Sequence, residues 1–108
     1  MQIFHLKIRP VIILTTAILL AGNSNITFAG NPFNGAPLYM RHCANCHGDN
    51  GQSKMLNVPN FARGEGVMQS DQQLLATIKS GKGTMPGFLG LLKDEEILDI
   101  IAHIRTLF

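Results

Sequence analysis

The stretch Cys43-Ala44-Asn45-Cys46-His47 decides what this chain is expected to fold into and to bind. Two cysteines three residues apart, followed at once by a histidine, form the attachment pattern for c-type haem. On one helical turn, positions i, i+3 and i+4 share a face, so the two thiols and the imidazole can reach one planar ligand. Each thiol can add across a haem vinyl group to form a thioether, and His47 can bind the iron as its proximal ligand. The chain has two cysteines in all, so both are assigned to the haem.

Three other uses of the cysteine pair stand beside the haem assignment. A thioredoxin-like redox pair belongs in a βαβ setting, and no β-rich segment surrounds these cysteines. A structural zinc ion needs four ligands. His42 and His47 could make up that number, but both adjoin the cysteines, which is awkward for a closed tetrahedron. The third alternative is a plain disulfide in an exported protein.

Residues 1–29 have the features of a secretory signal peptide. Lys7 and Arg9 supply the positive n-region, residues 11–21 form an apolar run, and the small residue Ala29 suits cleavage after it. The alternative is an uncleaved membrane anchor, but the run is shorter than the roughly 20 apolar residues that a span needs. No cysteine lies near its end, so a lipoprotein anchor is excluded. We therefore expect a cleaved signal and a periplasmic protein without a membrane span.

Residues 30–108 are then expected to form one small domain. The chain has nine Lys and Arg against seven Asp and Glu, but Lys7 and Arg9 leave with the signal, so the domain is near neutral. It has no basic run and no series of stacking aromatics, and nucleic acid is therefore not an expected partner. A chain this short buries little apolar surface by itself. A covalently attached haem would fill its centre, and export fits because bacteria attach c-type haem outside the cytoplasm.

The periodicity of the apolar residues predicts an all-α domain. The first helix is expected from Asn34, as its N-cap, to His47, with Pro37 in the first turn. The turn residues 48–51 end it. Residues 52–67 contain little periodicity and are expected to form a loop.

Two further helices are expected in the second half of the chain. Ser70 and Gln73 form a capping box, and Gly81 is placed to end the short helix that follows. The last helix begins with the acidic residues at Asp94 and continues with apolar residues at helical spacing to Leu107.

With these features, the chain resembles a small class I cytochrome c of the bacterial single-haem type, over nearly all of the expected domain. Gly35 and Tyr39 match the glycine and the aromatic residue by which that family's first helix crosses its last. Pro59 matches the proline whose carbonyl accepts the histidine's ring N–H, residues 83–87 resemble the methionine-ligand loop, and residues 94–107 match the C-terminal helix. The resemblance implies three to four short helices wrapped around one covalently bound haem, with the terminal helices crossing.

One position departs from the family pattern. The family commonly has Tyr or another aromatic residue where His103 stands. We expect His103 to fill that role as a flat ring packed near Gly35. The rival interpretation, in which His103 binds the iron, is disfavoured because it lies on a packing helix.

The sixth iron ligand is expected to be Met85. Glycines at 83 and 87 let the backbone approach the haem closely, and Pro86 stiffens the loop. The family match supports the same residue. The other methionines of the domain are expected to have packing roles or no special role: Met40, Met55 and Met68.

The surroundings of the haem follow from weaker signals. Pro59 is expected to fix the orientation of the His47 imidazole through a hydrogen bond. Arg63 or Lys82 could pair with a propionate, although a solvated surface charge is the simpler interpretation of either. Apolar character alone suggests the residues that wall the haem: Phe61, Leu74, Ile78, Phe88 and Ile101.

The function expected from this set is electron transfer and not catalysis. His/Met ligation raises the haem potential and leaves no open site on the iron, so the haem exchanges one electron at a time. The chain is therefore expected to be a monomeric periplasmic shuttle between two redox proteins. The alternatives are a haem enzyme or gas-binding protein with an open sixth position, and a thiol redox protein without haem.

Overall fold

Asn31 begins the first helix of the domain. In the computed structural model, which describes residues 29–108, Asn31 Oδ1 accepts a hydrogen bond from the amide of Phe33 at 2.9 Å and caps helix α2 (Pro32–His42). Pro32 suits the first helical position, because an N–H there has no partner in the helix. The expectation that Asn34 caps this helix is wrong. Asn31 accepts the hydrogen bond from the free amide of the first turn, and Asn34 lies inside the helix.

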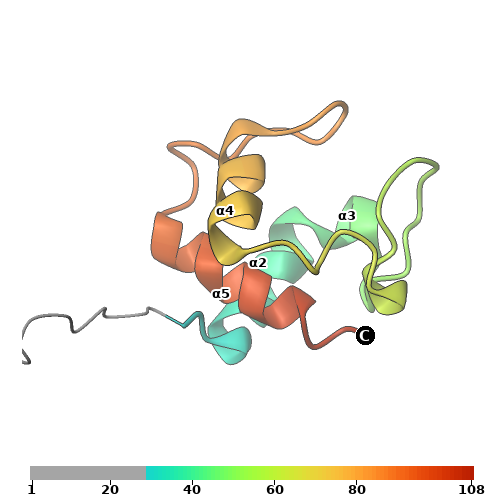
Figure 1. The fold of residues 1–108 in the computed structure, drawn as a ribbon, viewed down its shortest axis with the longest axis horizontal. Coiled ribbons are helices and arrows are strands. Elements are labelled where there is room, and N and C mark those ends of the chain that lie inside the picture. The colour runs from blue at the N-terminus through green and yellow to red at the C-terminus, as the bar shows by residue number, and fades with distance from the viewer. Residues whose placement is uncertain (1–28) are drawn as a thin grey trace, which may run out of the picture.

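The first helical segment is interrupted at Cys43. The backbone of Cys43 has φ −121° and ψ −38°, outside the α-helical range, and separates α2 from the short helix α3 (Ala44–His47). Gly48, at φ 82°, then ends α3. The prediction of one continuous helix to His47 is therefore wrong, because the helix is broken at Cys43. As a consequence, the segment that carries the second cysteine and the histidine turns away from the axis of α2 (Figure 1).

The capping box begins helix α4 (Asp71–Ser80) as expected. Ser70 Oγ accepts from the amide of Gln73 at 3.3 Å, and Gln73 Oε1 accepts from the amide of Ser70 at 3.1 Å. Gly81, at φ 77°, ends the helix. The loop before it contains one element that the sequence did not indicate, the 3₁₀ turn η1 (Phe61–Arg63).

The last helix, α5 (Asp94–Ile104), begins at the predicted acidic residue. Glu96 Oε2 accepts from the amide of Lys93 at 2.8 Å and closes its first turn. The helix ends three residues before Leu107, because Thr106 and Leu107 donate their amides in tight turns to His103 and Ile104. Leu107 still packs, half-buried, against the core.

The terminal helices α2 and α5 cross closely, as Figure 1 shows. A Cβ atom on Gly35 would collide with the backbone carbonyl of Asp99, so the two backbones touch at this glycine. One turn further along, Tyr39 is fully buried and its ring centroid lies 5.2 Å from that of His103, at an interplanar angle of 58°. The crossing and the aromatic role of His103 are both confirmed, with Tyr39 as the direct partner of His103.

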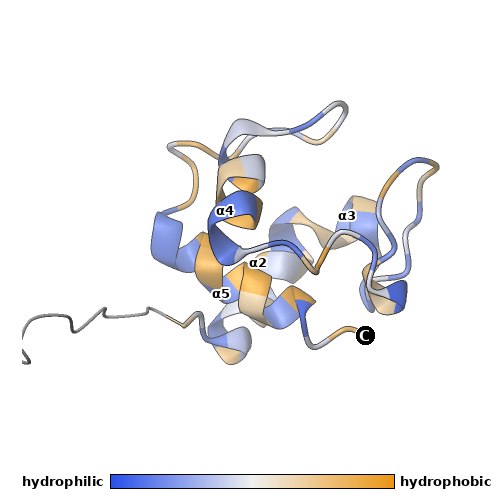
Figure 2. Cartoon of the chain, viewed as in Figure 1, coloured by the Kyte–Doolittle hydropathy of each residue, from blue (hydrophilic) through white to orange (hydrophobic). Residues whose placement is uncertain are grey.

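Helix α4 packs against α5 and completes the core. Arg105 donates to the carboxylate of Asp71 at 2.6 Å and to the carbonyl of Gln69 at 2.9 Å, which ties the end of α5 to the start of α4. Figure 2 shows hydrophobic residues on α5 where it passes its neighbours. The buried apolar side chains form one cluster: Tyr39, Ala44, Val67, Ile78, Phe88, Leu92, Ile97, Ile100, Ile101 and Ile104.

The described part of the chain is helical apart from its loops. Within residues 29–108 the only β-type pairings are two isolated bridges, Lys82 with Met85 and Leu89 with Leu92. None of the helices in this range has the length and apolar character needed to cross a membrane. The predicted all-α class is confirmed; residues 1–28, which contain most of the expected signal peptide, lie outside the described residues.

Candidate haem site

The junction between α2 and α3 gathers the three residues of the attachment pattern. Cys43 occupies the junction, and its carbonyl accepts from the amides of Cys46 at 3.2 Å and His47 at 3.0 Å. One turn of backbone therefore carries both thiols and the imidazole. Both cysteines are free thiols and half-buried.

The environment of Cys43 is unlike that of a redox-active thiol. Burial, followed by the nearby Cys46, raises the pKa of the Cys43 thiol to about 11. Reactive cysteines have a lowered pKa, because the thiolate is the nucleophile. Burial thus favours the protonated form of the Cys43 thiol. Among residues 29–108, no three side chains of His, Cys, Asp or Glu are placed to share a metal ion.

The imidazole of His47 lies beside Pro59, as expected, but without a complete hydrogen bond. Burial lowers the pKa of His47, and the carbonyl of Pro59 acts in the opposite direction. The carbonyl is thus close enough to favour a proton on the ring. Nδ1 is nevertheless buried and has no partner in hydrogen-bonding geometry. The lowered pKa favours the neutral imidazole, which is the form that binds a metal.

Phe61 covers one face of the His47 ring. The two ring centroids lie 4.4 Å apart and the planes differ by only 8°. The sequence assigned Phe61 to the wall of the haem because it is apolar, and gave no sign of this stacking. Its position two residues after Pro59 was the only available signal, because η1 turns Phe61 back toward the histidine.

Tyr39 anchors the end of the attachment turn. Its hydroxyl donates to the carbonyl of Gly48 at 2.6 Å in a buried hydrogen bond, directly after His47. Burial, followed by the nearby Cys43 and Asp49, raises the pKa of Tyr39 to about 12, so the hydroxyl keeps its proton. The sequence predicted the ring of Tyr39 as a helix contact and missed this use of its hydroxyl.

Met85 differs from the other methionines of the domain in burial. It is half-buried against the core, whereas the exposed fractions are 50% for Met40, 49% for Met55 and 83% for Met68. Two backbone hydrogen bonds with Lys82, of 3.1 and 3.0 Å, close a tight turn that holds it. Met85 and His47 lie on separate segments of the chain, and their expected positions on opposite sides of one iron remain a prediction.

Backbone contacts at two glycines hold the Met85 loop against α4. A Cβ atom on Gly81 would lie 2.7 Å from the carbonyl oxygen of Met85. One on Gly87 would lie 2.7 Å from the carbonyl oxygen of Lys79. The amide of Phe88 then donates to the carbonyl of Ile78 at 3.0 Å. The methionine therefore sits on a rigid turn.

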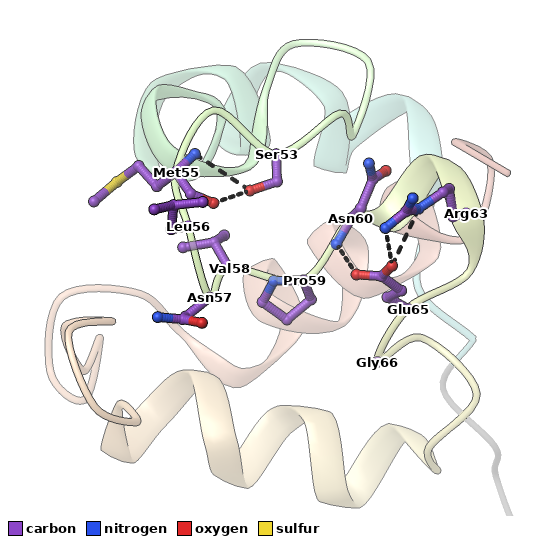
Figure 3. A pocket seen from close by; sticks show the side chains of 10 residues that line it. All are labelled: Ser53, Met55, Leu56, Asn57, Val58, Pro59, Asn60, Arg63, Glu65 and Gly66. Atoms are coloured by element: carbon purple, nitrogen blue, oxygen red, sulfur yellow. Dashed lines mark hydrogen bonds and ion pairs between the residues drawn. The ribbon is translucent and has the colours of Figure 1, made fainter.

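The loop that carries Pro59 is hollowed on its exposed side, where residues 53–66 line a cavity of about 520 Å³ (Figure 3). Arg63 lies at the rim of the cavity and pairs with Glu65 at 2.6 Å. The backbone amide of Asn60 also donates a hydrogen bond to Glu65 Oε2 at 2.8 Å. This hydrogen bond is the largest cause of the lowered pKa of Glu65. Arg63 thus has a carboxylate partner within the loop, which favours the surface-charge interpretation over a propionate contact. Lys82 is exposed.

The residues present fit a covalently bound haem. Two free thiols and an imidazole without a complete hydrogen bond lie on one turn. A half-buried thioether sulfur is offered by a separate rigid loop. Phe88, Ile78 and Ile101, three of the expected wall residues, belong to the buried core, and Leu74 packs against it.

Comparison with known proteins agrees with this chemistry. The family described as cytochrome c oxidase, cbb3-type, subunit III, matches residues 30–104. The cytochrome c6 of Nostoc sp. is 30% identical over 100 residues, which cover 91% of this chain and 90% of that protein. The cytochrome c6 of Thermosynechococcus vestitus is 31% identical over 102 residues, covering 92% of this chain and 91% of the relative.

Solved structures show the same likeness. KustC0563, a c-type cytochrome, superposes with a TM-score of 0.61 and 29% identity, over 68% of this chain and 95% of its own. Cytochrome c6 from the diatom Phaeodactylum tricornutum gives a TM-score of 0.58 and 25% identity, over 71% of this chain and 93% of its own. The likeness therefore spans almost the whole length of these small proteins.

Proposed function

The chain belongs to the class I c-type cytochromes, and from this we infer that it carries one covalently bound haem c and shuttles single electrons between redox proteins. It is an electron carrier and not an enzyme. The observation that carries this conclusion is the turn between α2 and α3, where two free thiols and an imidazole lie within five residues.

Each residue of the site has a definite role in this proposal. Cys43 and Cys46 would hold the haem through two thioether links, and His47 would bind its iron. Met85 would supply the second protein ligand to the iron, which its burial and its tight turn support. The bound haem supplies a one-electron Fe(III)/Fe(II) couple, whose potential a thioether ligand raises. Pro59 favours a proton on the His47 ring and so helps to fix the ring edge.

We place the protein in the periplasm as a monomer after removal of residues 1–29. The attachment pattern and the n-region with its apolar run support this location. Its electron donor and acceptor are redox proteins whose identity neither the fold nor the site specifies.

The proposal is tested by removing the two attachment points. Cys43→Ala combined with Cys46→Ala should abolish haem that survives denaturation, measured by haem staining of a denaturing gel and by the pyridine haemochrome spectrum. Met68→Leu changes an exposed side chain and should keep the full haem content. A double variant that stays red after acid-acetone extraction would show that haem is not attached here.

A further inference from the structure

We propose that Phe61 is a positioning residue for the imidazole of His47, and that its ring fixes the plane in which this imidazole meets the iron. The inference rests on the proposed role of His47 as an iron ligand. It assigns to Phe61 a task that is different from walling the haem.

The geometry of the pair sets it apart from the other aromatic contacts among residues 29–108. The rings of His47 and Phe61 are parallel within 8° at 4.4 Å. The other three contacts are tilted or edge-on: Tyr39 with Phe61 at 55°, Tyr39 with His103 at 58°, and His42 with Phe88 at 76°. A parallel pair at this distance is in direct face-to-face contact, near the short end of the usual range of about 4.5–7 Å. The contact therefore places the Phe61 ring against one face of the imidazole.

A stack and a hydrogen bond restrict an imidazole in different ways. A hydrogen bond donated by Nδ1–H lies in the plane of the ring, and it orients the ring only when its distance and angle are good. A parallel ring on the face resists movement of the imidazole out of its plane whether or not that hydrogen bond is made. In this structure Nδ1 lacks a complete hydrogen bond, and Pro59 acts only from nearby. The plane of the His47 ring is consequently held by Phe61.

The position of Phe61 is itself fixed from its backbone. In the 3₁₀ turn η1, the carbonyl of Phe61 accepts from the amide of Gly64 at 2.9 Å, and the next amide, that of Ala62, donates to the carbonyl of Gly51 at 3.2 Å. Gly51 is buried, three residues after the glycine that ends α3. The loop with Phe61 is thus attached to the segment that follows His47.

A second support comes from the crossing of the terminal helices. The ring of Tyr39 lies 6.5 Å from that of Phe61 and 5.2 Å from that of His103 on α5. Tyr39 also anchors Gly48 through its hydroxyl. A continuous series of packed rings therefore leads from α5 to the ligand, and Phe61 is its last member before His47.

The orientation of the imidazole plane can be measured by spectroscopy, separately from any effect of Phe61 on stability. The plane of an axial imidazole determines which of the iron d orbitals is raised by overlap with the ring. In the ferric protein, the g-values in electron paramagnetic resonance and the order of the haem methyl shifts in proton NMR both report this orientation. The test is made on the haem-loaded protein with these two measurements.

Phe61→Leu keeps an apolar side chain but removes the flat ring. We expect changed g-values and a changed order of the methyl shifts, with haem still attached. Phe61→Tyr keeps the ring and should restore the wild-type pattern. Ile97→Ala loosens the core at a fully buried residue outside the expected haem wall and should lower stability without this signature. If Phe61→Leu does not accumulate, Phe61→Ile makes the same removal with another side-chain shape.

Three results would overturn the inference. Wild-type g-values and methyl shifts in haem-loaded Phe61→Leu or Phe61→Ile would show that Phe61 does not set the plane, while leaving electron transfer intact as a function. An equal spectral change in Ile97→Ala would show a general effect of loosening the core. Absence of covalent haem from the wild-type protein would remove the proposed function and this inference together.

Discussion

At the scale of single residues, the site is a set of side chains each held by a different kind of contact. Phe61 packs on the face of the His47 ring, and the carbonyl of Pro59 lies near the edge of that ring. The hydroxyl of Tyr39 donates a hydrogen bond to the carbonyl of Gly48, the residue after His47. None of these contacts is a strong ion pair. Burial lowers the pKa of His47 and so favours the neutral imidazole, which is the form that binds a metal.

Met85→Ala tests the sixth ligand. Removing the thioether should open the iron to water, cyanide and carbon monoxide. It should also lower the reduction potential, by a measurable part of the roughly 0.8 V range that axial ligands span. The expected change follows from the preference of a thioether for Fe(II). Redox titration and carbon monoxide binding of the purified protein measure both effects.

The other methionines provide controls for the same experiment. Met40→Leu, Met55→Leu and Met68→Leu change exposed or half-exposed side chains of similar volume, and each should leave the absorption spectrum nearly unchanged. The assignment of Met85 fails if its alanine variant keeps a low-spin, cyanide-resistant haem while one of these three loses it. Rapid binding of carbon monoxide by the wild type would favour the enzyme or gas-binding class.

His103 gives the domain a pH dependence with a definite sign. Burial lowers the pKa of His103 from its ordinary value of 6.5. The unfolded chain therefore binds this proton more readily, so the contribution is fully present above about pH 6.5 and is lost as the pH falls toward the folded-state value. His103→Phe should lose less thermal stability than the wild type between pH 7 and pH 5. Equal losses in the two proteins would contradict this role.

At the scale of elements, the crossing of α2 and α5 positions the site. Gly35 allows the backbones to touch, and Tyr39, one turn later, reaches from the crossing to the end of the attachment turn. A change in the angle between these helices would therefore move the carbonyl of Gly48 and the histidine before it. The side chain of Tyr39 therefore couples the crossing of α2 and α5 to the position of the turn that carries His47.

Gly35→Ala should separate the crossing helices. The added methyl group would collide with the carbonyl of Asp99, which is backbone and cannot rotate away. A loss of about 3 kcal/mol or more in the free energy of unfolding is expected. Gly83→Ala is the matched control, because Gly83 has φ 60° and open space around it, so only the left-handed backbone is penalised, by about 1 kcal/mol. Denaturant unfolding of the two variants gives the comparison, and equal losses would contradict a special role for the crossing.

The start of α2 offers a paired test of its cap. Asn31→Ala removes the side-chain acceptor of the amide of Phe33 and should lower stability by about 1 kcal/mol. Asn34→Ala places a better helix former inside the helix and should be neutral or slightly stabilising. Thermal unfolding distinguishes the two. A larger loss at Asn34 would restore it as the cap.

At the scale of the whole molecule, the domain has a well-defined start. The backbone of Gly30 packs against the carbonyl of Leu98, where a Cβ atom would collide, and the amide of Asn31 donates to Asp99 at 2.6 Å. Tight packing begins one residue after the proposed cleavage site at Ala29. Cleavage there would remove the export signal without disturbing the contacts that hold α2 on α5.

Intact mass of the exported protein tests this boundary. We expect the mass of residues 30–108 plus one haem, because the n-region, the apolar run and Ala29 fit a signal peptidase site. A mass that retains Met1 would favour the membrane-anchor alternative. Extraction with salt or with detergent separates a released protein from an anchored one by an independent route.

Local patterns in the sequence were sufficient for several features that depend on neighbours along the chain, although not for the cap of α2 at Asn31 or the break at Cys43. The spacing of Cys43, Cys46 and His47 needs only one helical turn, and the capping box at Ser70 and Gln73 needs only three residues. These contacts form wherever the local backbone forms. The helical class, the starts of α4 and α5, and the covalent haem were therefore predictable without knowledge of the fold.

Tertiary structure alone decided the contacts between residues far apart in the sequence. The stack of Phe61 on His47 and the reach of the Tyr39 hydroxyl to Gly48 depend on how loops and helices come together in space. An apolar or aromatic residue in a sequence indicates burial but not its neighbour, because burial has no direction whereas a stack or a hydrogen bond does. The sequence thus determined which chemical groups form the site, and the packing of α2, α5 and η1 determined how the His47 ring is oriented.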